Sequence, residues 1–239
     1  MLVRKLSLSW GFIVAALASF ALLSLSPAVA AAQAVSAMQC KIVRTAGDVW
    51  LYPQAGEEYH QAEAGETMVS GDMLRVGEDS KVLLVFPGGT LLLLKENSDF
   101  YLHKLDSSGG AKLEIYSGGF LANVKKMLSP GASFEVQVPN SLAVVRGTVF
   151  GANIAPSGEV EFRGYQGEVE LTYRGRKLRL KPYQLYRLAR ERAALAKHRI
   201  AVAQALKEFE FKARPPLHRL ERLKNLQKAA KARRRRRHR

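Results

Sequence analysis

The stretch Val82-Leu83-Leu84-Val85-Phe86-Pro87-Gly88-Gly89-Thr90-Leu91-Leu92-Leu93-Leu94 decides how this chain folds. It holds two short apolar runs on either side of a Pro-Gly-Gly turn. Proline fixes φ and glycine accepts positive φ, so these residues reverse the direction of the chain. The first run is apolar at every position, which is typical of a strand that is covered on both faces. The stretch therefore predicts a central β-hairpin.

The same pattern of short strand and turn continues outward from this hairpin on both sides. Turn residues recur about every 8–12 residues, a spacing typical of sandwiches, barrels and other all-β folds. Ser133 to Val138 and Glu168 to Tyr173 alternate apolar and polar residues, and no stretch of the middle region holds a helical period. We therefore expect residues 35–188 to form an all-β domain of many short strands, either a sandwich or a solenoid-like stack.

The first 34 residues are predicted to be a secretory signal peptide. Arg4 and Lys5 precede an uncharged, mostly apolar run from Leu6 to Leu25, and small residues follow it. Cleavage is expected after Ala30 or Ala34. Because the apolar run is close to the ~20 residues that span a bilayer, an uncleaved anchor is the alternative. Either way, the protein is expected in the periplasm or cell envelope.

The positive charge lies almost entirely at the C-terminal end. The whole chain has a net charge of +16, and the part from Arg187 onward holds 19 Lys and Arg against 4 Glu. Residues 35–186 carry a net charge of only −1. A nucleic-acid-binding domain would show a basic surface of its own. We therefore expect no nucleic-acid partner.

Residues 189–232 are predicted to be a basic helical region, the C-terminal amphipathic helical tail of the fold. Apolar residues recur at every seventh position from Leu188 to Phe209, which indicates an amphipathic helix of about 20–25 residues. Pro215-Pro216 breaks the region. We expect the first helix to dock on the β domain; pairing with a second copy as a coiled coil is the alternative.

Residues 233–239 are predicted to be a disordered, arginine-rich terminus, because like charges repel. Guanidinium groups suit phosphate and carboxylate groups. The arginines are therefore expected to contact an anionic membrane or lipopolysaccharide, and a solubilising tail without a dedicated partner is the alternative. They are Arg233, Arg234, Arg235, Arg236, Arg237 and Arg239.

Five motifs occur in a fixed order and resemble the FecR domain. They are Gly71-Asp72-Met73-Leu74, Ser80 to Leu94, Ile115 to Gly119, Val145 to Phe150 and Gly167 to Leu171, and the resemblance covers residues 44–188. We expect the family-motif residues to be structural, with glycines where backbones approach closely. These residues are Gly71, Asp72, Gly89, Thr90, Gly118, Gly119, Arg146, Gly147 and Thr148.

The resemblance implies a periplasmic all-β regulator that relays iron-siderophore occupancy from an outer-membrane receptor to an anti-sigma function. Such regulators place an anti-sigma segment before a membrane span, whereas only five residues precede the apolar run here. We therefore expect an exported, non-catalytic binding, scaffold or sensing domain. A signal-relay component without its own anti-sigma segment is the alternative. The expected partner is an unknown envelope protein or a polysaccharide.

The sequence holds no recognisable catalytic pattern. None of the five histidines has metal-ligand spacing, and neither a nucleotide-binding glycine loop nor a G-x-S-x-G elbow occurs. The single cysteine, Cys40, cannot pair within the chain and is expected to be a buried or idle thiol. We expect no catalytic residue, metal or cofactor, and a polysaccharide-active enzyme is the third and least favoured function.

Overall fold

The computed structural model describes residues 39–56, 58–106, 109–127, 129, 131–189, 193–214 and 216. The predictions for the signal peptide, for cleavage after Ala30 or Ala34, for the part of the basic helical region after Pro216 and for the six terminal arginines lie outside these residues. Among the described residues, no helix combines the length and the apolar character needed to cross a membrane.

The described residues build two facing sheets, A and B, which confirms the all-β prediction. Sheet A runs, in spatial order, β4 (Thr67–Met68), β1 (Cys40–Ala46), β6 (Lys81–Val85), β7 (Leu91–Leu94), the second half of β9 (Ala111–Asn123), β12 (Val149–Ile154), β13 (Val160–Gln166), β16 (Gln184–Leu188) and β17 (Ala193–Lys197). Sheet B runs β3 (His60–Gln61), β2 (Val49–Tyr52), β5 (Met73–Val76), β8 (Ser98–Leu105), the first half of β9, β10 (Phe134–Val138), β11 (Ser141–Val145), β14 (Val169–Tyr173) and β15 (Arg176–Leu180).

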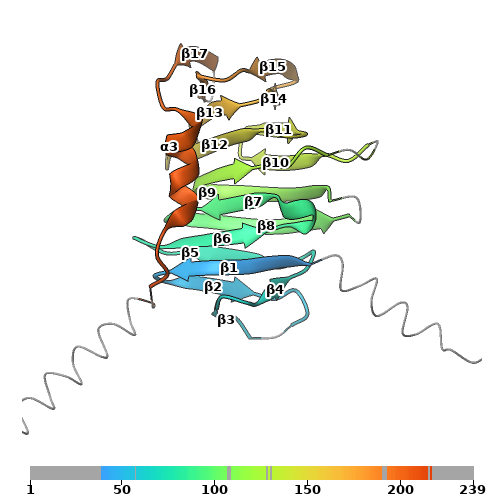
Figure 1. Ribbon diagram of the computed structural model, residues 1–239, viewed down its shortest axis with the longest axis vertical. Helices are drawn as coiled ribbons and strands as arrows, with labels where there is room; N and C mark the ends of the chain where they lie inside the picture. Colours follow the sequence, from blue (N-terminus) through green and yellow to red (C-terminus); the bar gives the residue numbers. More distant parts are fainter. Residues whose placement is uncertain are drawn as a thin grey trace, which may run out of the picture. The chain divides into compact units, whose positions relative to one another are not determined.

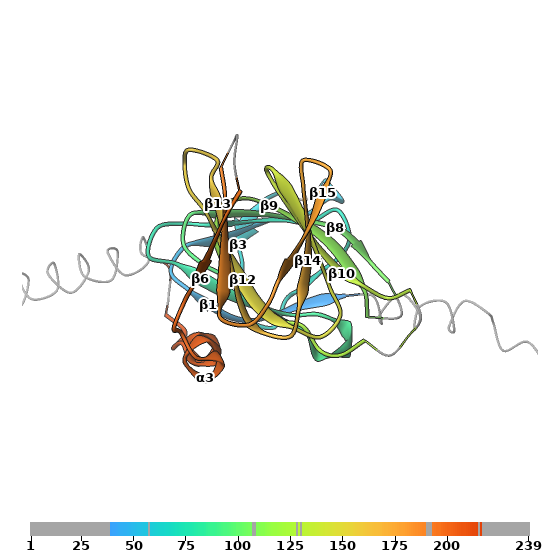
Figure 2. The same cartoon turned by 90° about the horizontal axis from the view of Figure 1, so that it is seen from above.

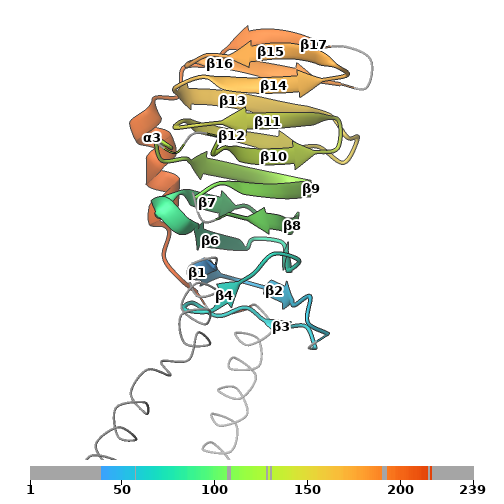
Figure 3. The same cartoon turned by 90° about the vertical axis from the view of Figure 1, so that its right-hand side faces the viewer.

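From β6 onward, consecutive hairpins of the chain belong alternately to sheet A and sheet B. The β6–β7 hairpin lies in sheet A and is followed by β8–β9 in sheet B. After β9 has crossed into sheet A, β10–β11 lies in sheet B, β12–β13 in A, β14–β15 in B and β16–β17 in A. The hairpins are therefore stacked one above another in chain order (Figures 1 and 3). This arrangement explains the regular recurrence of short strands and turns in the sequence.

Strand β9 joins the two sheets at one glycine. Its residues 111–117 pair with β8 in sheet B, and residues 118–123 pair with β7 and β12 in sheet A. Gly118 has a φ of +77°, a conformation that residues with a Cβ rarely adopt. The strand therefore turns from one sheet into the other at Gly118.

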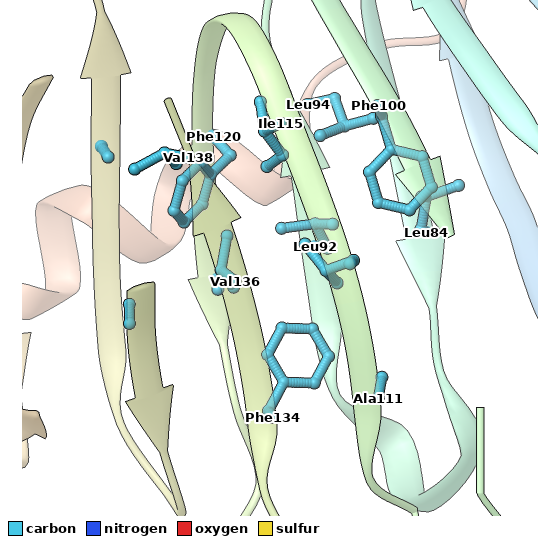
Figure 4. Packing of buried hydrophobic residues seen from close by; sticks show 14 of the residues in the cluster. Leu84, Leu92, Leu94, Phe100, Ala111, Ile115, Phe120, Phe134, Val136 and Val138 are labelled. Carbon is cyan, nitrogen blue, oxygen red and sulfur yellow. The ribbon is translucent and has the colours of Figure 1, made fainter. Parts of the chain in front are cut away.

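The main core fills the space between the two sheets. Leu84 and Leu92 from sheet A face Phe100 and Phe134 from sheet B, and all four side chains are buried (Figure 4). Each such side chain contributes about 1.5–3 kcal/mol relative to full exposure. The size of this cluster accounts for the stability of a body made of short strands.

A second apolar cluster covers the outer face of sheet A. Leu83 and Leu93 point away from the main core and pack with Ala205 and Phe209, which follow the last strand. These two residues belong to helix α3 (Val202–Leu206) and the 3₁₀ turn η2 (Lys207–Glu210), which lie outside sheet A (Figure 2). The predicted covering of both faces of the first apolar run is confirmed, and so is the docking of the C-terminal helix.

The helix is much shorter than the sequence predicted. Residues Ala193–Lys197 form strand β17, which pairs antiparallel with β16, and helix α3 begins only at Val202. Alanine and leucine are strong helix formers, but ordinary residues differ in helix propensity by less than about 1 kcal/mol each, and tertiary context overrides such preferences. Here β16 offers an open row of backbone hydrogen-bonding groups, and β17 satisfies them. The sheet therefore extends past the predicted boundary at residue 188.

Candidate functional site

Gly71 and Asp72 fix the start of β5. The Asp72 carboxylate is buried and accepts a hydrogen bond from the Gln54 backbone N–H at 2.9 Å and another from the Val69 N–H at 2.8 Å. A buried carboxylate requires such donors, because a buried charge without partners is costly. Gly71 has a φ of +101° and donates its N–H to the Leu102 carbonyl. Both residues therefore hold turns together.

Two further parts of the motif converge on the segment that follows β9. The buried hydroxyl of Thr90, next to Gly89 in the β6–β7 turn, accepts a hydrogen bond from the Lys125 N–H at 3.2 Å. Gly147 has a φ of +120°, and a Cβ there would lie 3.1 Å from the Lys126 Cα. The backbones of the two segments therefore approach each other closely at Gly147.

The residues on either side of Gly147 differ in their surroundings. The carbonyl of Thr148 accepts the Val124 N–H at 2.8 Å, whereas its buried Oγ1 has no hydrogen-bond partner among the described residues. The side chain of Arg146 is exposed. The motif Arg146-Gly147-Thr148 therefore anchors the segment after β9 through its backbone.

Gly118 and Gly119 lie at the point where β9 passes between the sheets. The Ser98 hydroxyl donates to the Gly119 carbonyl at 3.0 Å and accepts the Gly119 N–H at 3.0 Å. A Cβ on Gly118 would lie 2.3 Å from the Ser98 Oγ and 2.6 Å from the Asn97 carbonyl oxygen. Only glycine fits this position without displacing backbone.

A cleft of about 510 Å³ opens beside this crossing and is the candidate ligand site, which we call the crossing cleft. Gly118 and Gly119 line it together with the exposed ring of Tyr116 and the side chains of Asn97 and Asn153. Pockets of this size, with apolar walls and a few polar groups, are typical ligand sites. The sequence did not reveal the cleft, because its walls come from turns far apart in the chain. The one feature of the sequence that pointed to this position was the Gly118-Gly119 pair.

The described residues offer little for acid-base or metal chemistry. Within the described ranges, no group of three or more His, Cys, Asp or Glu residues lies close enough together to hold a metal ion. Cys40 is fully buried, as predicted, and burial raises the pKa of its thiol far above the ordinary value. Reactive cysteines instead have lowered pKa values and exposed sulfur atoms. Cys40 is therefore a packing residue.

Comparison with known proteins agrees with the motifs. Residues 72–170 match the family described as FecR protein. No curated protein matches the chain. Two crystal structures of a proposed anti-sigma factor from Parabacteroides distasonis ATCC 8503 are similar. The first, at 2.50 Å resolution, shows 17% identity and a TM-score of 0.47 over 53% of this chain and 59% of that chain. The second, at 1.65 Å, shows 17% identity and a TM-score of 0.48 over 57% and 64%.

The chain therefore spans about three fifths of the length of these two structures. The family match covers the central strands from the start of β5 into β14, and it includes every family-motif residue from Asp72 to Thr148. Residues 72–170 of this chain therefore match the FecR family, in agreement with the resemblance that the motifs indicate.

Proposed function

We propose that this chain is an exported, non-catalytic FecR-type domain of the cell envelope that binds or senses an envelope ligand, and that its arginine-rich tail contacts an anionic surface. The FecR match supports a regulatory role. The crossing cleft supplies a place for a ligand. The surface-contact part of the proposal is based on the path that the C-terminal segment takes over the protein.

The C-terminal segment crosses the outer face of sheet A and ends beside β1. The Arg44 guanidinium donates hydrogen bonds to the carbonyls of Phe209 at 3.3 Å and Phe211 at 2.7 Å, and it lies 5.5 Å from the centre of the Phe211 ring. Ala46, the last residue of β1, forms a parallel bridge with Arg214. We call residues 200–214 the C-terminal strap.

The strap brings both described ends of the chain to the same strand. Cys40 begins β1, and Arg214 lies beside the residue that ends it. Seven residues of strand span about 20 Å. The segment before β1 and the basic segment after the strap therefore start from the same end of the stack.

Electrostatic attraction gives the tail its expected affinity. Each Lys or Arg near an anionic membrane contributes about 1 kcal/mol, and salt screens the interaction. Six arginines acting together suffice to hold a protein at a surface at low salt. The binding is expected to weaken steeply as the salt concentration rises.

Sedimentation with lipid vesicles tests this part of the proposal. The full chain, a variant without residues 233–239, a variant with the six arginines changed to lysine and one with all six changed to glutamine are mixed with anionic or neutral vesicles. We expect the full chain and the lysine variant to bind anionic vesicles in a salt-sensitive manner, and the other two to remain in solution. Equal sedimentation of all four would refute the surface-contact role.

Fractionation tests export. Mass spectrometry of the envelope fraction is expected to find a chain that begins at Ala31 or Val35, the residues after the two expected cleavage sites. Recovery of the intact chain from the cytosol would contradict the proposal. Retention of the N-terminal segment in the membrane fraction would indicate the anchored form instead.

The alternative function is a signal-relay component that acts with a separate regulator. The FecR match favours it, because the resemblance implies a relay between a receptor and an anti-sigma function. Cross-linking in the native envelope followed by affinity capture separates the two functions. Recovery of an outer-membrane receptor or a membrane-bound regulator supports the relay, and its absence from captures that contain other envelope components supports the first proposal.

A further inference from the structure

The outer face of sheet B carries a group of aromatic side chains beside β2. Val49 and Leu51 point into the core, so Trp50 and Tyr52 point outward. Tyr59, which is 61% exposed, stacks on Tyr52 with ring centres 5.1 Å apart and meets Trp50 edge-on at 5.9 Å. These three rings form an aromatic cluster at one end of the face.

A second aromatic group lies on β8 and β9 of the same face. Tyr101 meets His103 edge-on with ring centres 4.4 Å apart. The Glu114 carboxylate accepts the hydroxyl of Tyr116 at 3.0 Å and lies 2.9 Å from the His103 Nε2. Burial and the hydrogen bond to Glu114 raise the pKa of Tyr116, so its hydroxyl remains a donor at neutral pH. The polar contacts hold these rings in place.

The cross-strand register sets the distance between the two groups. Tyr52 lies opposite Met73, Met73 opposite Tyr101, and Tyr101 opposite Glu114. Neighbouring strands are about 4.8 Å apart, so the Tyr52 and Tyr101 backbones are about 10 Å apart. Tyr116 belongs both to this face and to the crossing cleft, so the face continues into the cleft.

Several charged groups lie between and beside the rings. Arg75 donates to Asp99 at 2.7 Å and lies 6.0 Å from the centre of the Tyr52 ring, and Glu114 is paired with His103. Lys112 is also exposed on β9 of this face, two residues before Glu114. The face therefore presents aromatic rings and hydrogen-bonding groups together with charges of both signs. Because both signs are present, it offers no strong field of one sign that would select a highly charged ligand.

We propose that this aromatic face, defined by Trp50, Tyr52, Tyr59, Tyr101 and Tyr116, binds an extended, uncharged glycan whose chain runs into the crossing cleft. This inference rests on the proposed envelope-binding function, and it adds the chemical class of the ligand. Sugar rings have apolar C–H faces that stack on aromatic rings, and their hydroxyl groups bond to carboxylate, guanidinium and imidazole groups. In a flat β-linked glycan, two sugar units extend over a distance similar to that between Tyr52 and Tyr101.

The arrangement of the rings favours a glycan over a protein. A protein interface buries a continuous apolar core surrounded by polar residues. On this face the aromatic rings are interleaved with the Arg75–Asp99 ion pair, and the aliphatic side chain between Tyr52 and Tyr101 is that of Met73, which is 38% exposed. Alternating rings and hydrogen-bonding groups match a chain of sugars, in which apolar and polar surfaces also alternate.

Tryptophan fluorescence tests the proposal with the full chain. The sequence holds two tryptophans, so changing Trp10 to phenylalanine leaves Trp50, on this face, as the only reporter. The probes are cellohexaose and chitohexaose, two uncharged β-1,4-linked hexasaccharides, with polygalacturonate as the charged comparison. We expect a saturable change in Trp50 emission with at least one uncharged probe.

Three variants made in the Trp10→Phe chain locate the site. Tyr101→Ala and Tyr116→Ala each remove a ring that binding would cover, so each is expected to weaken affinity about tenfold, in the range of interface hot spots. Tyr183→Ala is the matched control, because Tyr183 is 50% exposed and lies outside the aromatic face. It is expected to leave affinity unchanged.

The inference is overturned if neither uncharged probe gives a saturable change, if only polygalacturonate binds, or if Tyr183→Ala weakens binding as much as the face variants. Circular dichroism spectra that match the parent confirm that the variants are folded. The vesicle and fractionation experiments do not involve this face. A negative glycan result therefore refutes the ligand class without refuting the proposed envelope function.

Discussion

Replacing Gly118 by alanine tests the claim that one glycine lets β9 pass between the two sheets. Gly118 has a φ of +77°, and a Cβ there would lie 2.3 Å from the Ser98 Oγ and 2.6 Å from the Asn97 carbonyl oxygen. Gly175, in the β14–β15 turn, has nearly the same φ, +75°, but a Cβ there would meet nothing within 4 Å. The two substitutions therefore share the backbone penalty and differ only in crowding.

The two costs follow from these contacts. A left-handed conformation costs an alanine about 1–2 kcal/mol, and this cost applies at both positions. At Gly118 the added methyl must also displace backbone, and such overpacking typically costs about 1–3 kcal/mol. Weakening of the two Ser98–Gly119 hydrogen bonds adds about 1 kcal/mol for each bond lost. We expect Gly118→Ala to destabilise the protein by about 3–5 kcal/mol and Gly175→Ala by about 1–2 kcal/mol.

Urea denaturation of the full chain measures the free energy of unfolding of each variant against the parent. We expect the two variants to differ in unfolding free energy by at least about 2 kcal/mol. This difference is the sum of the overpacking cost and the hydrogen-bond cost, which apply only to Gly118→Ala. If both substitutions lower stability equally, the close approach at Gly118 does not constrain the fold. The account of the sheet crossing would then be wrong.

Three further predictions concern single side chains. Thr148→Val is expected to be neutral or to stabilise by up to about 1 kcal/mol in thermal unfolding, because the hydroxyl is buried without a partner among the described residues; a loss of several kcal/mol would contradict this. Phe209→Ala is expected to loosen the C-terminal strap and to cost about 2–4 kcal/mol, visible as faster proteolysis of the strap; an unchanged cleavage rate would show that the strap is held elsewhere. Burial raises the pKa of Glu161, but hydrogen bonds from Arg187 and Arg163 outweigh it and lower the pKa below 4.5. Glu161 thus stabilises the fold above pH 4.5, and this contribution is lost as the pH falls through the lowered value. The stability difference between the parent and Glu161→Gln should shrink on acidification below pH 4.5, and a constant difference would refute the ion-pair explanation.

The sequence predicted the strands well because their signals are local. The hairpin from Val82 to Leu94 and the alternating strand at Ser133 to Val138 follow from residue spacing and turn residues alone. Several of the motif glycines lie at positions of positive φ. Backbone geometry at Gly118 and Gly147 is encoded by the residue itself, since few other residues accept it.

The features that the sequence missed depend on contacts between distant segments. Residues 193–197 have helix-forming composition, but the open edge of β16 recruits them as a strand. The crossing cleft brings together residues from the β7–β8 turn, β9 and the end of β12, and the aromatic face brings together residues from β2, β8 and β9. Strand alternation alone does not show which strands are neighbours. Both features depend on the order in which the strands pair, and local residue preferences do not determine that order.

The two sheets differ in their outer faces, and this difference determines where a ligand can bind. The central strands of sheet A are apolar on both sides, so Leu83, Leu93 and Leu121 would meet water unless another segment covered them. The covering segment, the C-terminal strap, lies beyond residues 72–170, which match the FecR family. The corresponding strands of sheet B alternate between buried and more exposed residues, with bulges in β8, and place rings and charged groups outward. Sheet A therefore needs the strap for stability, whereas the outer face of sheet B can meet water uncovered and is the face that a ligand can reach.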